Sequence, residues 1–282
     1  MNKKLYVLPF DHRSSFVKMF GFSENAMTED EVAVIKDYKH LIYEAFLSAL
    51  EMGVGKKEAA ILVDERFGSE IHQAARVAGI TRLLSAEKSG QTEFDFEYGS
   101  NFAEHIDALK PEYVKTLIRY NPDGDGELNA RQLAKLKTIN DFCKENHYGF
   151  LFELLAEPVS NGETISKSII QLHEAGIEPD VWKIEGLEKA EEMKGVVDRI
   201  RSGGRVNAGV VVLGRGESDE KVRIWLQVAA AIPGVIGFAV GRTVFKQAIL
   251  DFHEKKIDRA RAVEIIAKNY KDFVDFFEKN QK

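Results

Sequence analysis

The chain has 282 residues, of which 44% are hydrophobic and 30% are charged, and its formal net charge at pH 7 is -6. This balance is typical of a globular protein with a large apolar core and argues against disorder. The negative charge argues against nucleic acid or an anionic membrane as the main partner, although a local basic pocket could still bind phosphate.

Short apolar, β-branched runs alternate with amphipathic segments along the whole chain. In chain order, the runs predicted as strands are Leu5–Phe10, Ala59–Val63, Thr81–Ser85, Tyr113–Arg119, Phe150–Leu155, Val181–Ile184, Ala208–Leu213 and Val235–Val240. Helices are predicted between them near Glu31–Met52, Ser69–Val77, His105–Leu109, Asn129–Asn146, Ile165–Ala175, Glu188–Arg201 and Asp219–Ala231. Eight such units favour a closed (β/α)8 TIM barrel over a doubly wound open sheet, which more often stops at five or six strands.

The segment after the last strand predicts one further element. Ile257–Asn280 has the pattern of an additional C-terminal helix that packs outside the barrel. Because no long Pro/Ser-rich linker interrupts the chain, we predict a single domain over residues 1–282. The sequence leaves open whether the protein forms a homo-oligomer.

Cysteine content and hydropathy bear on the compartment. Cys143 is the only cysteine, so neither an intrachain disulfide nor a zinc–cysteine site is expected. The apolar run before Asp11 is too short for a signal peptide, and no stretch approaches the roughly 20 apolar residues that span a bilayer. We therefore expect a soluble, cytoplasmic protein.

Polar side chains stand in or directly after several predicted strands. In a TIM barrel the active site lies where the C-terminal strand ends and the following loops converge. The predicted active-site residues of these strands are Asp11, Arg13, Asp64, Lys88, Lys115, Arg119, Glu153 and Lys183. Three lysines and several carboxylates could therefore face one cavity.

Lys183 is the strongest candidate among these residues. It stands in the short apolar strand of Asp180–Gly186, where a lysine is costly unless a charge partner or a function holds it. A lysine nucleophile must be partly neutral to attack a ketone, and a neighbouring cation such as Lys115 can favour the neutral form. The sequence leaves open that Lys183 faces outward or merely pairs with Glu153 or Glu185.

Two carboxylates are candidates for proton transfer. Asp11 follows the first strand directly and could bind or deprotonate a substrate hydroxyl, or it could cap the loop with Ser14. Glu153 lies within a strand and is predicted to point inward, where it either meets a lysine or takes part in catalysis. The remaining candidates, Arg13, Asp64, Lys88 and Arg119, are predicted to bind substrate.

The last two strands end in loops that contain glycine and arginine. In barrels these loops often bind phosphate, because backbone N–H groups and a helix N-terminus favour an anion there. The predicted phosphate-binding residues are Gly214, Arg215, Gly241 and Arg242, and either arginine could add a bidentate contact.

One segment resembles part of a calcium-binding loop. Asn121–Asn129 is rich in Asp, Asn and Gly, but Gln132 stands where an EF-hand needs a bidentate glutamate, and no helix precedes it. We therefore predict a turn that caps the next helix. The seven histidines show no HxH or HExxH spacing. No metal site and no cofactor are predicted.

Four motifs resemble those of a known barrel family. They are Leu8–Arg13, Ala86–Gln91, Val114–Lys115 with Arg119–Pro122, and Gly237–Thr243. Together they look like the barrel domain often fused behind 5-dehydro-2-deoxygluconokinase in bacterial inositol catabolism. That domain is similar to the tagatose-1,6-bisphosphate and sulfofructose-phosphate class I aldolases, in which a strand-six lysine in an Asp-Val-x-Lys-x-Glu setting forms the imine. Lys183 matches that position.

The resemblance implies retro-aldol cleavage of a phosphorylated ketose or keto-sugar acid. One such substrate is 2-deoxy-5-keto-gluconate 6-phosphate, which would give dihydroxyacetone phosphate and malonate semialdehyde. This chain departs from the fused arrangement because it has no kinase half. Two alternatives stay open: a phosphosugar isomerase or epimerase that uses carboxylate bases on the same fold, and a non-catalytic sugar-phosphate-binding partner of a carbohydrate kinase.

Overall fold

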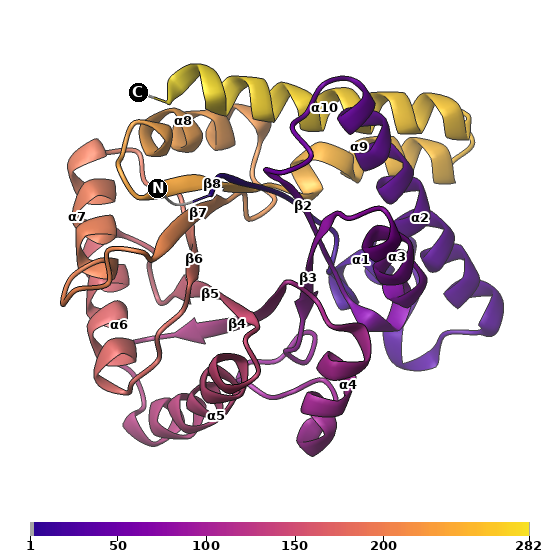
Figure 1. Ribbon diagram of the computed structural model, residues 1–282. Coiled ribbons are helices and arrows are strands. Elements are labelled where there is room, and N and C mark those ends of the chain that lie inside the picture. The colour runs from indigo at the N-terminus through magenta and orange to yellow at the C-terminus, as the bar shows by residue number, and fades with distance from the viewer. Residues whose placement is uncertain (1–2, 282) are drawn as a thin grey trace.

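Eight parallel strands close into a barrel in the order β1 to β8 in the computed structural model, which describes residues 3–281 (Figure 1). The strands are β1 (Leu5–Pro9), β2 (Ala59–Val63), β3 (Thr81–Ser85), β4 (Tyr113–Tyr120), β5 (Gly149–Ala156), β6 (Val181–Glu185), β7 (Gly209–Leu213) and β8 (Val235–Ala239). The predicted (β/α)8 barrel is therefore confirmed. Residues 1, 2 and 282 of the predicted domain lie outside the described residues.

The helices form a ring around the strands (Figure 1). They are α1 (Ser14–Lys18), α2 (Glu29–Glu51), α3 (Glu65–Val77), α4 (Phe102–Leu109), α5 (Gly126–Glu145), α6 (Gly162–Glu174), α7 (Ala190–Ile200), α8 (Asp219–Ala230), α9 (Arg242–His253) and α10 (Arg259–Asn280). The segment between β1 and α2, predicted as a polar loop, contains α1 and a 3-10 turn at Glu24–Ala26. No helix within residues 3–281 combines the length and apolarity needed to cross a membrane.

The inside of the barrel is filled by apolar side chains from the strands. Their cluster consists of Leu5, Val7, Ala60, Leu62, Leu83, Leu151, Val181, Val211, Ile236 and Ala239, with Tyr113 packed against it. Because side chains two residues apart share a face of a strand, Lys115, Glu153 and Lys183 follow Tyr113, Leu151 and Val181 on the inner face. The apolar cluster thus forms the floor beneath a polar layer.

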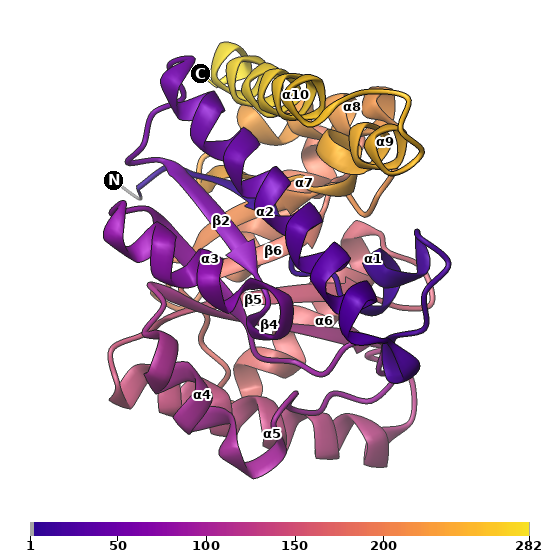
Figure 2. The same ribbon diagram turned by 90° about the vertical axis from the view of Figure 1, so that its right-hand side faces the viewer.

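The predicted C-terminal helix is present as α10, and it packs against α2, α8 and α9. Figures 1 and 2 show it lying across these helices, with the C-terminus on the same side of the molecule as the N-terminus. The Tyr270 hydroxyl donates to the backbone carbonyl of Tyr6 at 2.7 Å, and the Tyr6 hydroxyl donates to Glu278 Oε1 at 3.1 Å. Helix α10 therefore fastens β1, which completes the barrel by pairing with β8.

Candidate active site

A cavity of about 440 Å³ opens at the C-terminal ends of the strands. Of the residues predicted from sequence, those that line it are Asp11, Arg13, Lys88, Lys115, Arg119, Glu153, Lys183, Gly214, Arg215, Gly241 and Arg242. Asp64 is the one predicted site residue that does not. The cavity walls also include His12 and Glu87, which belong to the motifs Leu8–Arg13 and Ala86–Gln91 but were not predicted as site residues.

Three carboxylates surround Lys115 at the base of the cavity. Its Nζ atom lies 2.6 Å from Glu87 Oε1, 2.9 Å from Asp11 Oδ2 and 3.0 Å from Glu153 Oε2. Burial favours the neutral amine, but Asp11, Glu153 and Glu87 outweigh it and hold the pKa of Lys115 well above 10.5. Lys115 is therefore a fixed cation near neutral pH.

Lys183 has a different environment, although it is only 5% exposed. Glu153 is its partner in the register between β5 and β6, and Lys183 Nζ donates to Glu153 Oε2 at 2.8 Å. The same oxygen also contacts Lys115, so Glu153 bridges the two ammonium groups. Lys183 thus points into the barrel, not outward between the helices.

The three carboxylates differ in acidity. Burial acts to raise the pKa of both Asp11 and Glu153, but Lys115 and neighbouring cations outweigh it and leave both pKa values below their ordinary range. For Glu87, burial prevails over Lys115 and Arg13 and raises the pKa above 4.5. The cluster therefore combines two carboxylates that stay ionised with one that retains a proton more readily.

His12 lies beside Asp11 on the loop that follows β1. Its Nδ1 atom is 4.0 Å from Asp11 Oδ1 and is buried without a hydrogen-bond partner among the described residues. Burial lowers its pKa to about 4, and Arg242, Lys183 and Lys115 act in the same direction against Asp11. The His12 imidazole is therefore neutral at physiological pH, so one ring nitrogen can donate a hydrogen bond and the other can accept one.

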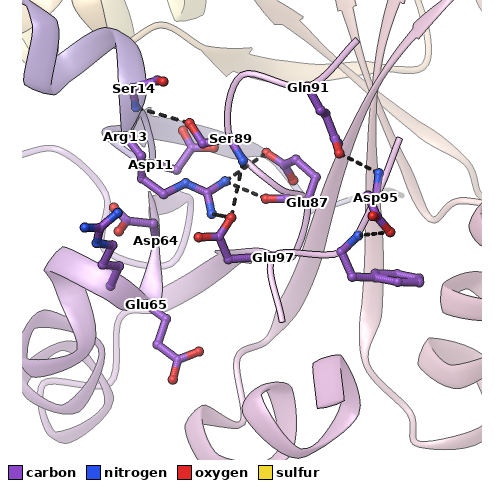
Figure 3. Close-up of polar contacts among 12 residues, drawn as sticks. Asp11, Arg13, Ser14, Asp64, Glu65, Glu87, Ser89, Gln91, Asp95 and Glu97 are labelled. Carbon is purple, nitrogen blue, oxygen red and sulfur yellow. Dashed lines mark hydrogen bonds and ion pairs between the residues drawn. The ribbon is translucent and has the colours of Figure 1, made fainter. Parts of the chain in front are cut away.

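Arg13 is directed at the chain between β3 and α4 (Figure 3). Its Nη2 atom donates to the backbone carbonyl of Glu87 at 2.5 Å, and Nη1 lies 3.0 Å from Glu97 Oε2. The chain there folds back on itself through an antiparallel bridge between Glu87 and Phe96. Arg13 lines the cavity, but these two contacts hold residues 87–97, which we call the 87–97 hairpin.

Asp64 lies outside the cavity and is fully buried. One of its oxygens caps α3 by accepting from the Phe67 N–H at 2.9 Å, and the other pairs with Lys39 Nζ from α2. The rings of Phe16 and Phe67 enclose that ammonium, with centroids 5.7 and 5.5 Å away. Because both oxygens are occupied in the protein interior, we leave Asp64 out of the proposed binding residues.

The arginines of the last two loops form one corner of the cavity. Arg242 Nη2 donates to the backbone carbonyl of Arg215 at 2.7 Å, and Arg215 Nη1 donates to Glu185 Oε1 at 2.5 Å. Gly216 has φ +80° and lies against the Arg242 guanidinium, where a Cβ atom would come within 2.8 Å of Cζ. The positive φ favours glycine there, and the absence of a side chain leaves room for the Arg242 guanidinium.

Lys88 and Arg119 lie at the opposite rim, on the ends of β3 and β4, and both are exposed. Arg119 makes a loose ion pair with Glu157 at 3.4 Å. The cavity thus has cationic side chains on two sides, with the lysine–carboxylate cluster between them.

The calcium-like segment serves as a helix start. Asp125 caps α5 by accepting from the N–H groups of Glu127 and Leu128, and Asn121 Oδ1 accepts from the Asp123 N–H. The predicted capping turn is therefore confirmed. Among residues 3–281, no group of His, Cys, Asp and Glu side chains is arranged to hold a metal ion.

Comparison with known proteins gives three findings. Residues 1–281 match the family described as "Uncharacterized protein conserved in bacteria (DUF2090)". Tagatose 1,6-diphosphate aldolase 2 of Streptococcus mutans is 26% identical over 199 residues, a match that covers 67% of this chain and 55% of that protein. The crystal structure of Cgl0159 from Corynebacterium glutamicum superposes with a TM-score of 0.62 at 18% identity, over 95% of this chain and 85% of that one. The aldolase match thus spans little more than half of the relative, and the structural match speaks for the fold alone.

Proposed function

The chain belongs to the DUF2090 family of bacterial proteins, and we propose that it is a class I aldolase that cleaves a phosphorylated ketose or keto-sugar acid. The observation that carries this proposal is the unequal pairing of two lysines in one cavity. Lys115 is within 3.0 Å of three carboxylates, whereas Lys183 contacts one. The distant likeness to a tagatose 1,6-diphosphate aldolase supports the same reaction class.

Lys183 is the proposed nucleophile. An amine must lose a proton to attack a carbonyl, and Glu153 is hydrogen-bonded to Lys183 at 2.8 Å, in position to accept it. Lys115, with its raised pKa, remains protonated and acts electrostatically. In this proposal Lys183 supplies the nucleophilic amine and Lys115 supplies a permanent positive charge in the same cavity.

The proposed reaction is a retro-aldol cleavage. Lys183 adds to the substrate ketone, and loss of water gives a protonated imine that withdraws electrons. A carboxylate, Asp11 or Glu153, takes the proton of the hydroxyl group, the carbon–carbon bond breaks to release an aldehyde, and its electron pair forms an enamine. Protonation of the enamine carbon and hydrolysis of the imine return the free lysine and the second product.

The corner formed by the last two loops is the proposed phosphate site. Backbone N–H groups at Gly214 and Gly241 and the N-terminus of α9 favour an anion, and Arg242 adds a positive charge. Arg215 can join them by exchanging Glu185 for the ligand. Lys88 and Arg119 at the opposite rim are proposed to contact the far end of the substrate.

The finer identity of the substrate rests on the family resemblance. The proposed substrate is 2-deoxy-5-keto-gluconate 6-phosphate, cleaved to dihydroxyacetone phosphate and malonate semialdehyde as a step of inositol catabolism. A reducing cytoplasm fits a chain whose single thiol, Cys143, is buried.

Borohydride trapping tests the proposal. Incubation with dihydroxyacetone phosphate and sodium borohydride should add a reduced, irreversible adduct, and peptide mass analysis should place it on Lys183. A panel of ketose phosphates assayed for triose-phosphate release then identifies the substrate. Absence of any lysine adduct, or an adduct on another lysine, would overturn the assignment of Lys183.

A further inference from the structure

Glu87 is the member of the lysine–carboxylate cluster that the reaction above does not use. It lines the cavity, is 6% exposed, and contacts Lys115 Nζ at 2.6 Å through Oε1. Asp11 and Glu153 contact the same ammonium. Three carboxylates this close to one cation repel one another when all are ionised, so one of them holds a proton at lower cost than the others.

Glu87 is the least compensated of the three. Glu153 has a second cation in Lys183 at 2.8 Å, and the positive charge of Lys183 also acts on Asp11. The second oxygen of Glu87, Oε2, is buried and has no hydrogen-bond partner among residues 3–281, while Arg13 stays 3.9 Å from Oε1. Burial raises the pKa of Glu87, whereas the pKa values of Asp11 and Glu153 are lowered.

The backbone that carries Glu87 is firmly held. Its carbonyl oxygen accepts from Arg13 Nη2 at 2.5 Å (Figure 3), and the Glu97 N–H donates to the Ala86 carbonyl at 3.0 Å. The Ala86 N–H in turn donates to the Lys115 carbonyl of β4 at 2.9 Å. Glu87 is thus a fixed acid at the end of β3, separated from Lys183 of β6 by β4 and β5.

This position suits a step at the substrate carbon, not at the lysine nitrogen. Glu153 touches Lys183 directly and is placed to move protons at Nζ. Glu87 lines the same cavity and is linked to Lys183 only through Lys115 and Glu153, so it can meet a carbon of a substrate that is joined to Lys183.

We propose that Glu87 is the catalytic acid that protonates the enamine carbon after carbon–carbon cleavage, an assignment that rests on the proposed aldolase function. The proton on Oε2 moves to the carbon, the carbon–carbon π pair becomes the new C–H bond, and the nitrogen lone pair restores the protonated imine. Glu87 is left as a carboxylate stabilised by Lys115. One proton leaves the substrate hydroxyl and one arrives at carbon, so no further reactant is needed.

Hydrogen exchange at carbon isolates this step. In D₂O, an enzyme-bound imine of dihydroxyacetone phosphate exchanges its α-hydrogen through the enamine, and NMR follows the loss of that proton signal. We expect Glu87→Gln to slow this exchange by roughly 10²- to 10⁴-fold. Borohydride trapping on Lys183, which needs only the imine, should be retained. Glu87→Asp, which keeps an ionisable carboxyl group, should recover part of the exchange.

Glu93→Gln is the matched control, because Glu93 lies on the same hairpin but pairs with Arg131 and does not line the cavity. It should exchange at the wild-type rate. Wild-type exchange in Glu87→Gln would overturn the proposal, and so would a folded Glu87→Gln protein that fails to form the trapped imine, since Glu87 would then act earlier. If Glu87→Gln does not fold, Glu87→Asp takes its place in the test. Its exchange should be slower than that of the wild type, and exchange at the wild-type rate would overturn the proposal. A wild-type protein that neither traps nor exchanges instead refutes the aldolase function itself.

Discussion

Glu153 Oε2 lies 2.8 Å from Lys183 Nζ and 3.0 Å from Lys115 Nζ, so one carboxylate oxygen joins the two lysines of the cavity. The pairing follows from the barrel register, which sets Glu153 of β5 directly opposite Lys183 of β6. The positive charge buried on β6 is therefore paired with a negative charge on β5.

Lys183→Arg should separate the chemical role of this lysine from its structural role. Arginine keeps the positive charge opposite Glu153 but stays protonated and forms no imine. We expect turnover to fall on the order of 10⁶-fold, the scale seen when a covalent nucleophile is removed, with no borohydride adduct and a retained thermal transition. Lys167→Arg, at a surface lysine that pairs with Asp123, is the control and should behave as wild type. Substantial activity in Lys183→Arg would instead favour an isomerase or epimerase that uses carboxylate bases.

Arg242→Ala should weaken binding of the phosphate group specifically. The lost charged hydrogen bond corresponds to an increase in KM of roughly 10- to 100-fold for the phosphorylated substrate. The unphosphorylated analogue should be affected far less. Arg223→Ala removes an arginine from the surface of α8, where it pairs with Asp219, and should leave KM unchanged. An equal loss for both substrates would place the phosphate elsewhere.

Lys39→Met should destabilise the protein without removing a cavity residue. The change leaves Asp64 buried and unpaired, which costs about 3–5 kcal/mol of the free energy of unfolding. Adding Asp64→Asn should recover most of this loss, because asparagine still caps α3 and carries no charge. Guanidinium unfolding of the two single variants and the double variant measures the coupling. Additive losses would contradict a pair that acts as a unit.

His72 should make stability depend on pH below neutrality. The Nε2–H of this fully buried residue donates to the Val63 carbonyl at 3.2 Å, and burial lowers the pKa of His72 from 6.5 to about 4. Between pH 6.5 and 4 the His72 imidazole is therefore protonated in the unfolded chain but neutral in the folded chain. The free energy of unfolding falls as the pH falls from 6.5 toward 4, by about 3 kcal/mol in total. His72→Gln should remove this contribution, seen as a shallower decline in unfolding free energy between those pH values. An unchanged decline would contradict the assignment.

The strand positions could be predicted closely because each strand is a short apolar run bounded by polar residues. The predicted bounds of β2 and β3 coincide with the structure. The predicted bounds of β5 differ by one residue at both ends, and those of the other strands by one residue at one end. The short helix α1 was missed, because a five-residue helix is too brief to show a helical period.

The cavity residues were harder to predict than the strands. Glu87 was recoverable from alternation, since it continues the spacing of two set by Leu83 and Ser85 of β3, but it lies after the strand and beyond the apolar run. Asp64 was misplaced because its position after β2 is equally that of a helix cap, and its partner Lys39 comes from a helix 25 residues earlier. The spacing from Asp64 to the Phe67 N–H is the local signal for the cap. Arg13 was expected to face substrate, and no local pattern discloses that its partners lie on the 87–97 hairpin.

The fastening of β1 by α10 has a consequence for how the protein is made. Strand β1 leaves the ribosome first, yet its second neighbour, β8, begins at Val235, and the hydroxyl that binds Tyr6 belongs to Tyr270. The growing polypeptide must therefore carry an unpaired edge of β1 until β8 has been made. An early stop anywhere before β8 leaves that edge unpaired, and such fragments should aggregate or be degraded instead of persisting as partial barrels.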